Sequence, residues 1–254
     1  MTQKKSSRAV KSASPEVPHL KPVVRQSSTQ SLKIRIDDLK TFSPLTENQK
    51  LFFESYKAGD YFISLLGSPG VGKTFLAVYK ALEEVLDRGN GFEKVIIIRS
   101  AVQVRDVGFT PGSLEEKMAI YEAPYIDICR ILFGRGDAWS RLQEQGHVKF
   151  MSTTAVRGIT IDNSVIIVDE CQSMSWHELN SVISRSGHMS KIIFVGDLKQ
   201  NDLLKNKHDV SGLNQFLEVA QHMPEFTKII FTPDDIVRSS LVKSWIIACE
   251  KFGL

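Results

Sequence analysis

Cysteine is scarce in this chain of 254 residues, which contains only Cys129, Cys171 and Cys249 and no C-x-x-C pair. An odd, widely spaced set of this kind favours reduced thiols over a disulfide framework. The six histidines are equally scattered, and no zinc-ligand spacing is present. The sequence therefore does not have the pattern of a disulfide-rich secreted domain or of a zinc module.

Long hydrophobic runs are also missing. No stretch approaches the roughly 18 consecutive apolar residues of a membrane span, and the N-terminus lacks the apolar centre of a secretory signal. We therefore expect a cytoplasmic protein that does not enter a membrane. With 42% hydrophobic and 24% charged residues, the composition is that of an ordinary globular protein.

The positive charge is concentrated at the N-terminus. Residues 1–33 carry seven basic side chains against one glutamate, giving +6, whereas the remainder has 25 basic and 28 acidic residues, giving −3. Residues 1–31 are rich in Ser, Lys, Gln and Pro and show no periodicity, which predicts a disordered basic tail before a single domain at 32–254. The tail is either an electrostatic tether for RNA or DNA or a solvated extension without a specific role.

A glycine-rich motif follows the apolar run Tyr61–Leu66 directly. The motif is G-x-x-x-x-G-K-T and consists of Gly67, Ser68, Pro69, Gly70, Val71, Gly72, Lys73 and Thr74. Between a strand and a helix it predicts a phosphate-binding loop, in which backbone N–H groups and the positive end of the helix face the anion. We expect Lys73 to neutralise the β- and γ-phosphates of ATP and Thr74 to hold Mg²⁺. The alternative is a plain glycine-rich turn.

Apolar runs alternate with helical patterns along the rest of the chain. The predicted strands are Leu32–Ile36, Lys94–Arg99, His147–Ser152, Ser164–Val168, Lys191–Val195 and Phe226–Phe231. The predicted helices are Leu45–Tyr56, Phe75–Arg88, Leu114–Phe133, Trp176–Ser186, Gly212–His222 and Pro233–Phe252. This order indicates an α/β fold with a mostly parallel sheet flanked by helices, and ligands at the carboxyl ends of the strands.

The last predicted helix has a start signal and an apolar stripe. Thr232 is expected to cap it, with Pro233 as its first residue and Asp235 reaching back as in a capping box. The stripe consists of Val237, Leu241, Trp245 and Ala248, and we expect it to face the core.

An acidic pair follows the apolar strand Ser164–Val168. Asp169 stands where the acid on the Mg²⁺ side of a phosphate-loop enzyme belongs, about a hundred residues after the loop. Glu170 is expected to accept a proton from the attacking water, which favours hydrolysis over phosphoryl transfer to a small molecule. Taken alone, an acidic pair is also common in turns.

Two glutamines and an arginine are further candidates. Gln49 precedes the loop and is expected to contact adenine N6 and N7 through its amide, the alternative being a surface glutamine. Gln200 follows the strand Lys191–Val195 and is expected to sense the γ-phosphate by orienting water or by coupling to Gln172, the alternative being a polar loop. Arg238, one turn into the last predicted helix, is either a surface residue or the cation that stabilises a phosphoryl-transfer transition state.

The motifs together resemble the PhoH family of phosphate-loop ATPases. They run from Leu45 to Val242 in the order TENQ, GSPGVGKT, IIIRSAV, GFTPGSLEEK, RGIT, IIVDECQ, VGDLKQNDL, SGL and DIVRSSLV. The resemblance implies a single RecA-like core similar to one core of the superfamily 1 helicases, ATP hydrolysis and a link to RNA metabolism. It implies the nucleotide roles given above for Lys73, Thr74, Asp169, Glu170, Gln200, Arg238 and Gln49. It also implies that Arg99, Lys117 and Arg157 contact nucleic acid or a neighbouring subunit's phosphate.

The sequence departs from the family at several positions. Ser100 stands where the family usually has proline, and Ile159 replaces the second arginine of its R-G-R-T motif. None of the departures touches the hydrolytic residues, but the missing arginine weakens the loop after Arg157 as a nucleic-acid clamp.

Quaternary structure follows from the resemblance and from size. Superfamily 1 helicases place ATP between two cores, and about 220 ordered residues make only one. We therefore expect a ring homo-oligomer such as a hexamer, in which Arg157 or Arg238 completes the neighbour's site. The leading hypothesis is an ATPase that moves on or remodels single-stranded RNA or DNA, and the alternative is a nucleotide-gated assembly or regulatory factor that separates no strands. A small-molecule kinase is disfavoured by Glu170 and Gln200.

Overall fold

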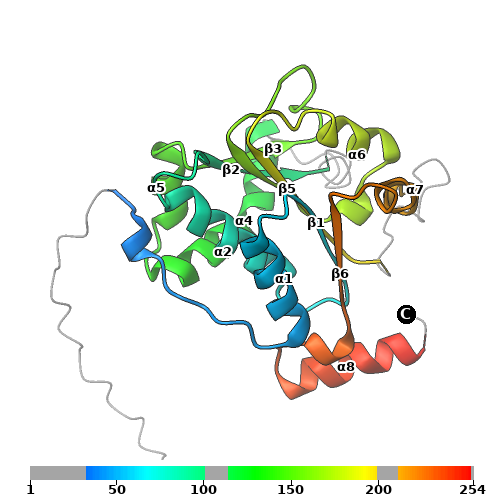
Figure 1. The fold of residues 1–254 in the computed structure, drawn as a ribbon. Helices are drawn as coiled ribbons and strands as arrows, with labels where there is room; N and C mark the ends of the chain where they lie inside the picture. Colours follow the sequence, from blue (N-terminus) through cyan, green and yellow to red (C-terminus); the bar gives the residue numbers. More distant parts are fainter. Residues whose placement is uncertain (1–32, 101–113, 199–210, 253–254) are drawn as a thin grey trace, which may run out of the picture. The chain divides into compact units, whose positions relative to one another are not determined.

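The computed structural model describes residues 33–100, 114–198 and 211–252 (Figure 1). The strands are β1 Phe62–Gly67, β2 Lys94–Arg99, β3 Val148–Ser152, β4 Ser164–Val168, β5 Ser190–Gly196 and β6 Phe226–Phe231. The α-helices are α1 Glu47–Ala58, α2 Lys73–Leu86, α4 Leu114–Phe133, α5 Ala138–Glu144, α6 Trp176–Ile183, α7 Leu213–Ala220 and α8 Ser240–Lys251. Short 3₁₀ turns are η1 Ile36–Asp38, η2 Cys171–Ser173 and η4 Pro233–Asp235. The predicted tail at 1–31 lies outside the described residues.

The strands form one sheet in the order β3-β2-β4-β5-β1-β6, and each pairing is parallel. Every residue of β1 and β4 is buried, which agrees with their mainly apolar sequences, because a strand covered on both faces needs apolar side chains on both. The predicted α/β fold is confirmed, and the five strands expected after the glycine-rich motif are all present.

Each face of the sheet packs against its own set of helices. Helices α1, α2, α4 and α5 cover one face, where Ile97 belongs to the same apolar cluster as Leu82 and Leu132 (Figure 1). Helices α6 and α7 cover the other face, where Ile98 belongs to the cluster of Leu179 and Phe216. Successive residues of a strand thus enter opposite cores, as the period of two requires.

The strand order decides where polar groups gather. Strand β5 lies between β1 and β4, so the residues that follow these three strands meet at one edge of the sheet. They are the loop after Gly67, the pair Asp169 and Glu170, and Asp197.

The strand predicted at Leu32–Ile36 is wrong in its described part. Residues 33–35 are irregular and Ile36 begins the turn η1, in which the carboxylate of Asp38 accepts a hydrogen bond of 2.9 Å from the backbone of Arg35. This local bond satisfies the backbone N–H of Arg35, which in a strand would donate to a neighbouring strand of the sheet.

The single helix predicted at Pro233–Phe252 is also wrong. Asp235 does reach back to the backbone N–H of Thr232 at 2.9 Å, as expected, but the turn it closes is the short η4. Ile236 then adopts an extended conformation and is buried, and α8 starts only at Ser240. The extended backbone at Ile236 places its side chain in the core, whereas a continuous helix would direct the chain away from the core at this point.

The apolar stripe predicted to face the core is exposed. Leu241 is 78% exposed and Trp245 is 70% exposed, and no side chain of α8 is fully buried. The opposite face of α8 approaches the glycine-rich loop instead, through Ile246 and Glu250. Helix α8 contacts the glycine-rich loop and packs only Ile246 against the core cluster, so its outer face stays exposed.

All three cysteines are free thiols, and Cys129 and Cys171 are buried. Burial raises the pKa of Cys129 to about 12. Within the described ranges, no helix has both the length and the hydropathy that a membrane crossing requires.

Candidate active site

The glycine-rich loop leaves β1 through a left-handed turn. Gly67 has φ +116°, and a Cβ there would stand 2.0 Å from the carbonyl oxygen of Phe231 in β6. Gly72, with φ 84°, sets the direction in which α2 begins. The two glycines bring the N-terminus of a 14-residue helix to the edge of the sheet, where its free N–H groups favour an anion.

The side chain of Lys73 lies back over the loop. Its Nζ donates to the carbonyl oxygens of Gly67 at 2.7 Å and Ser68 at 2.8 Å. Burial lowers the pKa of this lysine, and the nearby carboxylates of Asp197, Glu170 and Asp169 oppose that shift. The ammonium group is thus held beside the loop and facing acidic strand ends.

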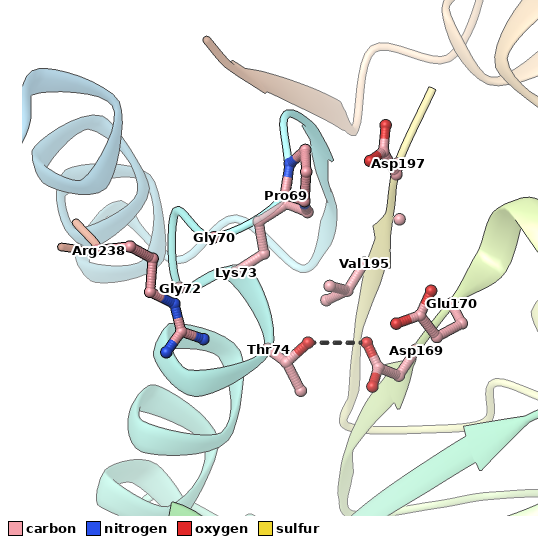
Figure 2. A pocket seen from close by; sticks show the side chains of 11 residues that line it. Pro69, Gly70, Gly72, Lys73, Thr74, Asp169, Glu170, Val195, Asp197 and Arg238 are labelled. Carbon is pink, nitrogen blue, oxygen red and sulfur yellow. Dashed lines mark hydrogen bonds between the residues drawn. The ribbon is translucent and has the colours of Figure 1, made fainter. Parts of the chain in front are cut away.

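Asp169 connects two motifs that are far apart in sequence. Its Oδ1 accepts a hydrogen bond of 2.9 Å from the Thr74 hydroxyl across 95 residues of sequence (Figure 2). Its Oδ2 accepts a second bond, of 2.7 Å, from the hydroxyl of Tyr125 in α4. The carboxylate is only 4% exposed, and both of its oxygens are oriented by side chains.

Tyr125 did not emerge as a site residue from the sequence. A helical spacing of four and seven residues relates it to Cys129 and Leu132, which are also fully buried, so the pattern indicates only a core face. Burial and the adjacent Asp169 raise the pKa of Tyr125 well above its usual range. Its hydroxyl therefore serves as a hydrogen-bond donor at neutral pH.

Glu170 has a left-handed backbone, with φ 54° and ψ 42°. Burial raises the pKa of its carboxyl, the charge of Asp169 adds to this shift, and a hydrogen bond from Gln172 opposes it. That bond, from Nε2 of Gln172 to Oε2, is 2.5 Å long. Glu170 is therefore a fixed and more basic carboxylate, which suits a proton acceptor.

Gln172 also connects the ends of two strands. Its Oε1 accepts a hydrogen bond of 3.0 Å from the backbone N–H of Asp197, which follows β5. The orientation of Glu170 after β4 is thereby tied to β5. Gln200 lies outside the described residues, so its expected coupling to Gln172 stays a prediction.

These groups surround a cavity of about 260 Å³. Its lining comes from the glycine-rich loop, the ends of β4 and β5 and one arginine: Pro69, Gly70, Gly72, Lys73, Thr74, Asp169, Glu170, Val195, Gly196, Asp197 and Arg238. Figure 2 shows the acidic residues on one side of the loop and Arg238 on the other. The sequence had indicated all but Val195, Gly196 and Asp197 as site residues.

Arg238 reaches the cavity from an exposed segment rather than from one turn inside a helix. It lies between η4 and α8, and its Cγ would be 3.1 Å from a Cβ added at Gly70. Nearby, the hydroxyl of the buried Ser68 donates to the carboxylate of Glu250 at 2.8 Å. The segment that begins at Arg238 therefore touches the loop at both of its ends.

Gln49 is only 3% exposed, so the alternative of a surface glutamine is wrong. Its Nε2 donates to the carbonyl of Val71 at 3.0 Å, and its Oε1 accepts from the N–H of Leu45 at 2.8 Å. The side chain fixes the loop to α1. Its amide retains one donor and one acceptor position, and the contact with adenine stays a prediction.

Neither Arg99 nor Arg157 lines the cavity, although the charge of Arg99 acts to lower the pKa of the lining residue Glu170. Arg99, at the end of β2, lies over the ring of Tyr121 in α4 at 5.4 Å. Arg157 is exposed in the loop after β3. The backbone of Lys117 lies in the first turns of α4, but its side chain is outside the described part of the chain.

A buried glutamate joins the loops that follow β2 and β3. Oε1 of Glu178 accepts from the hydroxyls of Ser100 at 2.9 Å and Thr153 at 2.6 Å, and its Oε2 accepts from the N–H and hydroxyl of Ser175 at 3.0 and 2.9 Å. Burial acts to raise the pKa of Glu178, but these hydrogen bonds outweigh it and the pKa is lowered. Ser100 thus donates a side-chain hydrogen bond that the proline expected here from the family resemblance could not donate.

The donor set fits a magnesium nucleotide. Thr74 and Asp169 bring a hydroxyl and a carboxylate oxygen together beside an anion-binding helix terminus. Mg²⁺ is a hard cation that proteins usually hold through one or two carboxylates plus substrate phosphates rather than through a complete protein cage. Among the described residues, no group of three His, Cys, Asp or Glu side chains forms a metal site.

Comparison with known proteins gives a family match over most of the chain. Residues 41–250 match the PhoH-like protein family. The PhoH-like protein of Bacillus subtilis is 32% identical over 213 residues, covering 84% of this chain and 65% of that protein. Protein PhoH of Escherichia coli is 28% identical over 222 residues, covering 86% of this chain and 62% of that protein. The chain thus spans less than two thirds of the length of these curated relatives.

The solved structures that match are distant. The large terminase from a thermophilic bacteriophage has a TM-score of 0.43 and 15% identity, covering 80% of this chain and 50% of that chain. At this distance the match supports no argument about activity.

Proposed function

Because the chain belongs to the PhoH family, we propose that it binds ATP with Mg²⁺ at the edge formed by β1, β4 and β5 and hydrolyses it. The observation that carries this proposal is the hydrogen bond between Thr74 and Asp169. It unites the glycine-rich loop with the acidic strand end in one cavity that also contains Lys73 and Glu170. These are the parts that phosphoryl transfer to water needs.

Each side chain then has a defined task. The loop amides and the start of α2 bind the phosphates, and Lys73 neutralises their charge. Thr74 and Asp169 hold Mg²⁺, which when bound offsets the negative charge of the phosphates. Glu170 takes a proton from the attacking water, and Arg238 stabilises charge that develops in the transition state. Gln49 contacts adenine, and Gln200 senses the γ-phosphate.

We further propose that hydrolysis is coupled to single-stranded RNA or DNA. The candidates for this contact are Arg99, Lys117 and Arg157, which belong to β2, to α4 and to the segment after β3. Neither Arg99 nor Arg157 lines the cavity. A basic side chain at such a place can pair with phosphates of the strand without competing for the nucleotide.

The proposed assembly is a ring of identical chains, such as a hexamer. Two observations support a neighbouring copy: the exposed Leu241 and Trp245 on α8, and the exposed Arg157, which does not line its own cavity. Exposed clusters of large apolar side chains mark interaction surfaces. In a ring, Arg157 reaches the neighbour's nucleotide, and Arg238 serves the cavity of its own chain.

The test is steady-state ATP hydrolysis by the purified protein with and without single-stranded RNA or DNA, with Glu170→Gln as the blank. Turnover that rises with one of the two nucleic acids supports a coupled motor or remodelling factor. Turnover indifferent to both favours the nucleotide-gated assembly factor. No turnover above the Glu170→Gln blank contradicts the ATPase.

Oligomerisation is tested separately, by light scattering with ATP present across a range of protein concentrations. A ring predicts a mass several times that of the chain and a specific activity that rises with concentration. A monomer whose activity is independent of concentration contradicts the ring and leaves the ATPase intact.

A further inference from the structure

One hydroxyl outside the cavity lining orients the carboxylate on which the metal site depends. Tyr125 donates to Oδ2 of Asp169 at 2.7 Å, while Oδ1 accepts from Thr74 at 2.9 Å. Each oxygen of this carboxylate therefore has its own hydroxyl donor. A carboxylate held at both oxygens cannot rotate about its terminal bond without breaking one of these bonds.

The ring of Tyr125 is fixed by its neighbours. It stacks on Trp139 of α5, with ring centroids 6.0 Å apart and 25° between the planes, and lies 5.5 Å from the ring of Phe150 in β3. The residue is completely buried. Its hydroxyl can shift only if α4 shifts, so the position of α4 determines where the Asp169 carboxylate points.

A second tyrosine extends this contact to the next strand. Tyr121 lies four residues earlier in α4, on the same side of the helix, and its ring lies beneath the Arg99 guanidinium at the end of β2. Helix α4 thus contacts the carboxyl ends of both β2 and β4, which are neighbours in the sheet. One tyrosine touches a proposed nucleic-acid contact and the other touches the proposed Mg²⁺ ligand.

From this arrangement we infer that Tyr125 is a positioning residue, which aligns Asp169 for Mg²⁺ and makes metal affinity depend on the placement of α4. The inference rests on the proposed function, because it assumes that Asp169 holds the metal. A donor behind a metal-binding carboxylate fixes its orientation, and loss of such outer partners weakens metal binding by about 10- to 100-fold in other sites.

The experiment compares Tyr125→Phe with the wild-type chain by titration of a fluorescent ATP analogue. Its affinity is measured first in EDTA and then at increasing Mg²⁺, which gives the Mg²⁺ concentration for half-maximal tightening. We expect Tyr125→Phe to raise that concentration about tenfold and to leave the affinity in EDTA unchanged. Phenylalanine keeps the ring that packs on Trp139, and the affinity in EDTA reports whether the variant is folded.

Tyr56→Phe is the matched control. Tyr56 is also buried, and its hydroxyl also donates to a carboxylate, that of Glu84, but this pair lies beside Lys191 at the start of β5. The variant removes the same kind of bond at the opposite edge of the sheet and should leave the Mg²⁺ midpoint unchanged.

Three outcomes overturn the inference. An unchanged Mg²⁺ midpoint in Tyr125→Phe refutes the inference about Tyr125. It leaves the proposed function intact, because the wild type still binds the magnesium nucleotide. Equal shifts in Tyr125→Phe and Tyr56→Phe refute the inference as well, since the effect is then a general loss of packing. If the wild-type chain binds no nucleotide with or without Mg²⁺, the proposed function fails together with the inference.

Discussion

The cavity has two walls that differ in how firmly they are held. The strand wall consists of the residues after β4 and β5, where Asp169 is 4% and Asp197 is 5% exposed and Gln172 bonds to both strand ends. The arm wall is Arg238, which lies on an exposed segment that continues into α8, and most of the outer face of α8 is exposed as well. The strand wall is preorganised, whereas the arm wall is attached mainly through the loop contacts of Arg238, Ile246 and Glu250. The groups that the proposed reaction needs aligned in advance thus lie in the core, and the proposed transition-state cation lies at the surface.

The sharpest test of the strand wall is Glu170→Gln. An amide cannot accept the proton of the attacking water, so we expect the kcat for ATP hydrolysis to fall by about 10²–10⁴-fold. Nucleotide affinity should remain within a few-fold of wild type, because no loop contact is lost. The measurement is single-turnover hydrolysis beside equilibrium nucleotide binding, with the exposed Glu54→Gln on α1 as the control. A wild-type kcat in Glu170→Gln would show that Glu170 is not the general base.

For the arm wall, the matching change is Arg238→Ala. Because this side chain is exposed, its loss should not alter the thermal midpoint, yet kcat should fall by about 10²-fold if the guanidinium meets developing charge. Arg130→Ala, an exposed arginine of α4 paired with Asp127, is the control. A variant that loses stability but retains kcat would show that Arg238 braces Gly70 instead of acting on the nucleotide.

Glu178→Gln tests whether the hydrogen-bonded loops outside the cavity also stabilise the fold. The amide would turn a donor toward the N–H of Ser175, so we expect a loss of about 1–3 kcal/mol in the free energy of unfolding. The folded-state pKa of Glu178 is below its ordinary value near 4.5, so the carboxylate stabilises the fold fully above that pH. Its contribution disappears as the pH falls through the lowered pKa.

The measurement is urea unfolding of wild type and Glu178→Gln between pH 7 and pH 3. The difference between the two curves should be largest near neutral pH and should shrink in acid. A difference that grows toward acid would mean that the carboxyl is protonated in the folded chain.

The smallest expected effect is that of Trp245→Ala on the arm. Because Trp245 is 70% exposed, Trp245→Ala should change the free energy of unfolding of the isolated chain by less than about 0.5 kcal/mol. The buried Trp139, at 4% exposure, is the matched comparison, and Trp139→Ala should cost about 3–5 kcal/mol. Chemical denaturation at low protein concentration measures both. Similar losses for the two would restore the sequence-based expectation that Trp245 belongs to the core.

The sequence was sufficient to predict the site where a motif specifies both the residues and the secondary structure around them. The loop at 67–74 and the pair Asp169 and Glu170 follow apolar strands, and parallel strands deliver their carboxyl ends to one edge, so their meeting in one cavity could be predicted. Tyr125 could not, because helical periodicity distinguishes buried from exposed positions and says nothing about which carboxylate a buried hydroxyl reaches.

The error at α8 has a different physical origin. An apolar stripe at helical spacing indicates that a helix has something to bury, but not that its own chain supplies the partner. Here the chain breaks at Ile236 to fill the core, and the following stripe of Leu241 and Trp245 is left outside it.

The position of β1 within the sheet also bears on how the glycine-rich loop reaches its place during folding. Strand β1 pairs with β5 and β6, and its Phe62 meets Ile192 and Phe226, which lie 130 and 164 residues later (192 − 62 and 226 − 62). Contacts of such long sequence separation form slowly, because a large loop must close before any pairing energy is gained. During synthesis, β1 and its glycine-rich loop leave the ribosome before β5 and β6 and cannot pair with those strands until they have followed. The segment that carries the glycine-rich motif is therefore made before its partner strands and takes its place in the sheet only after they have followed.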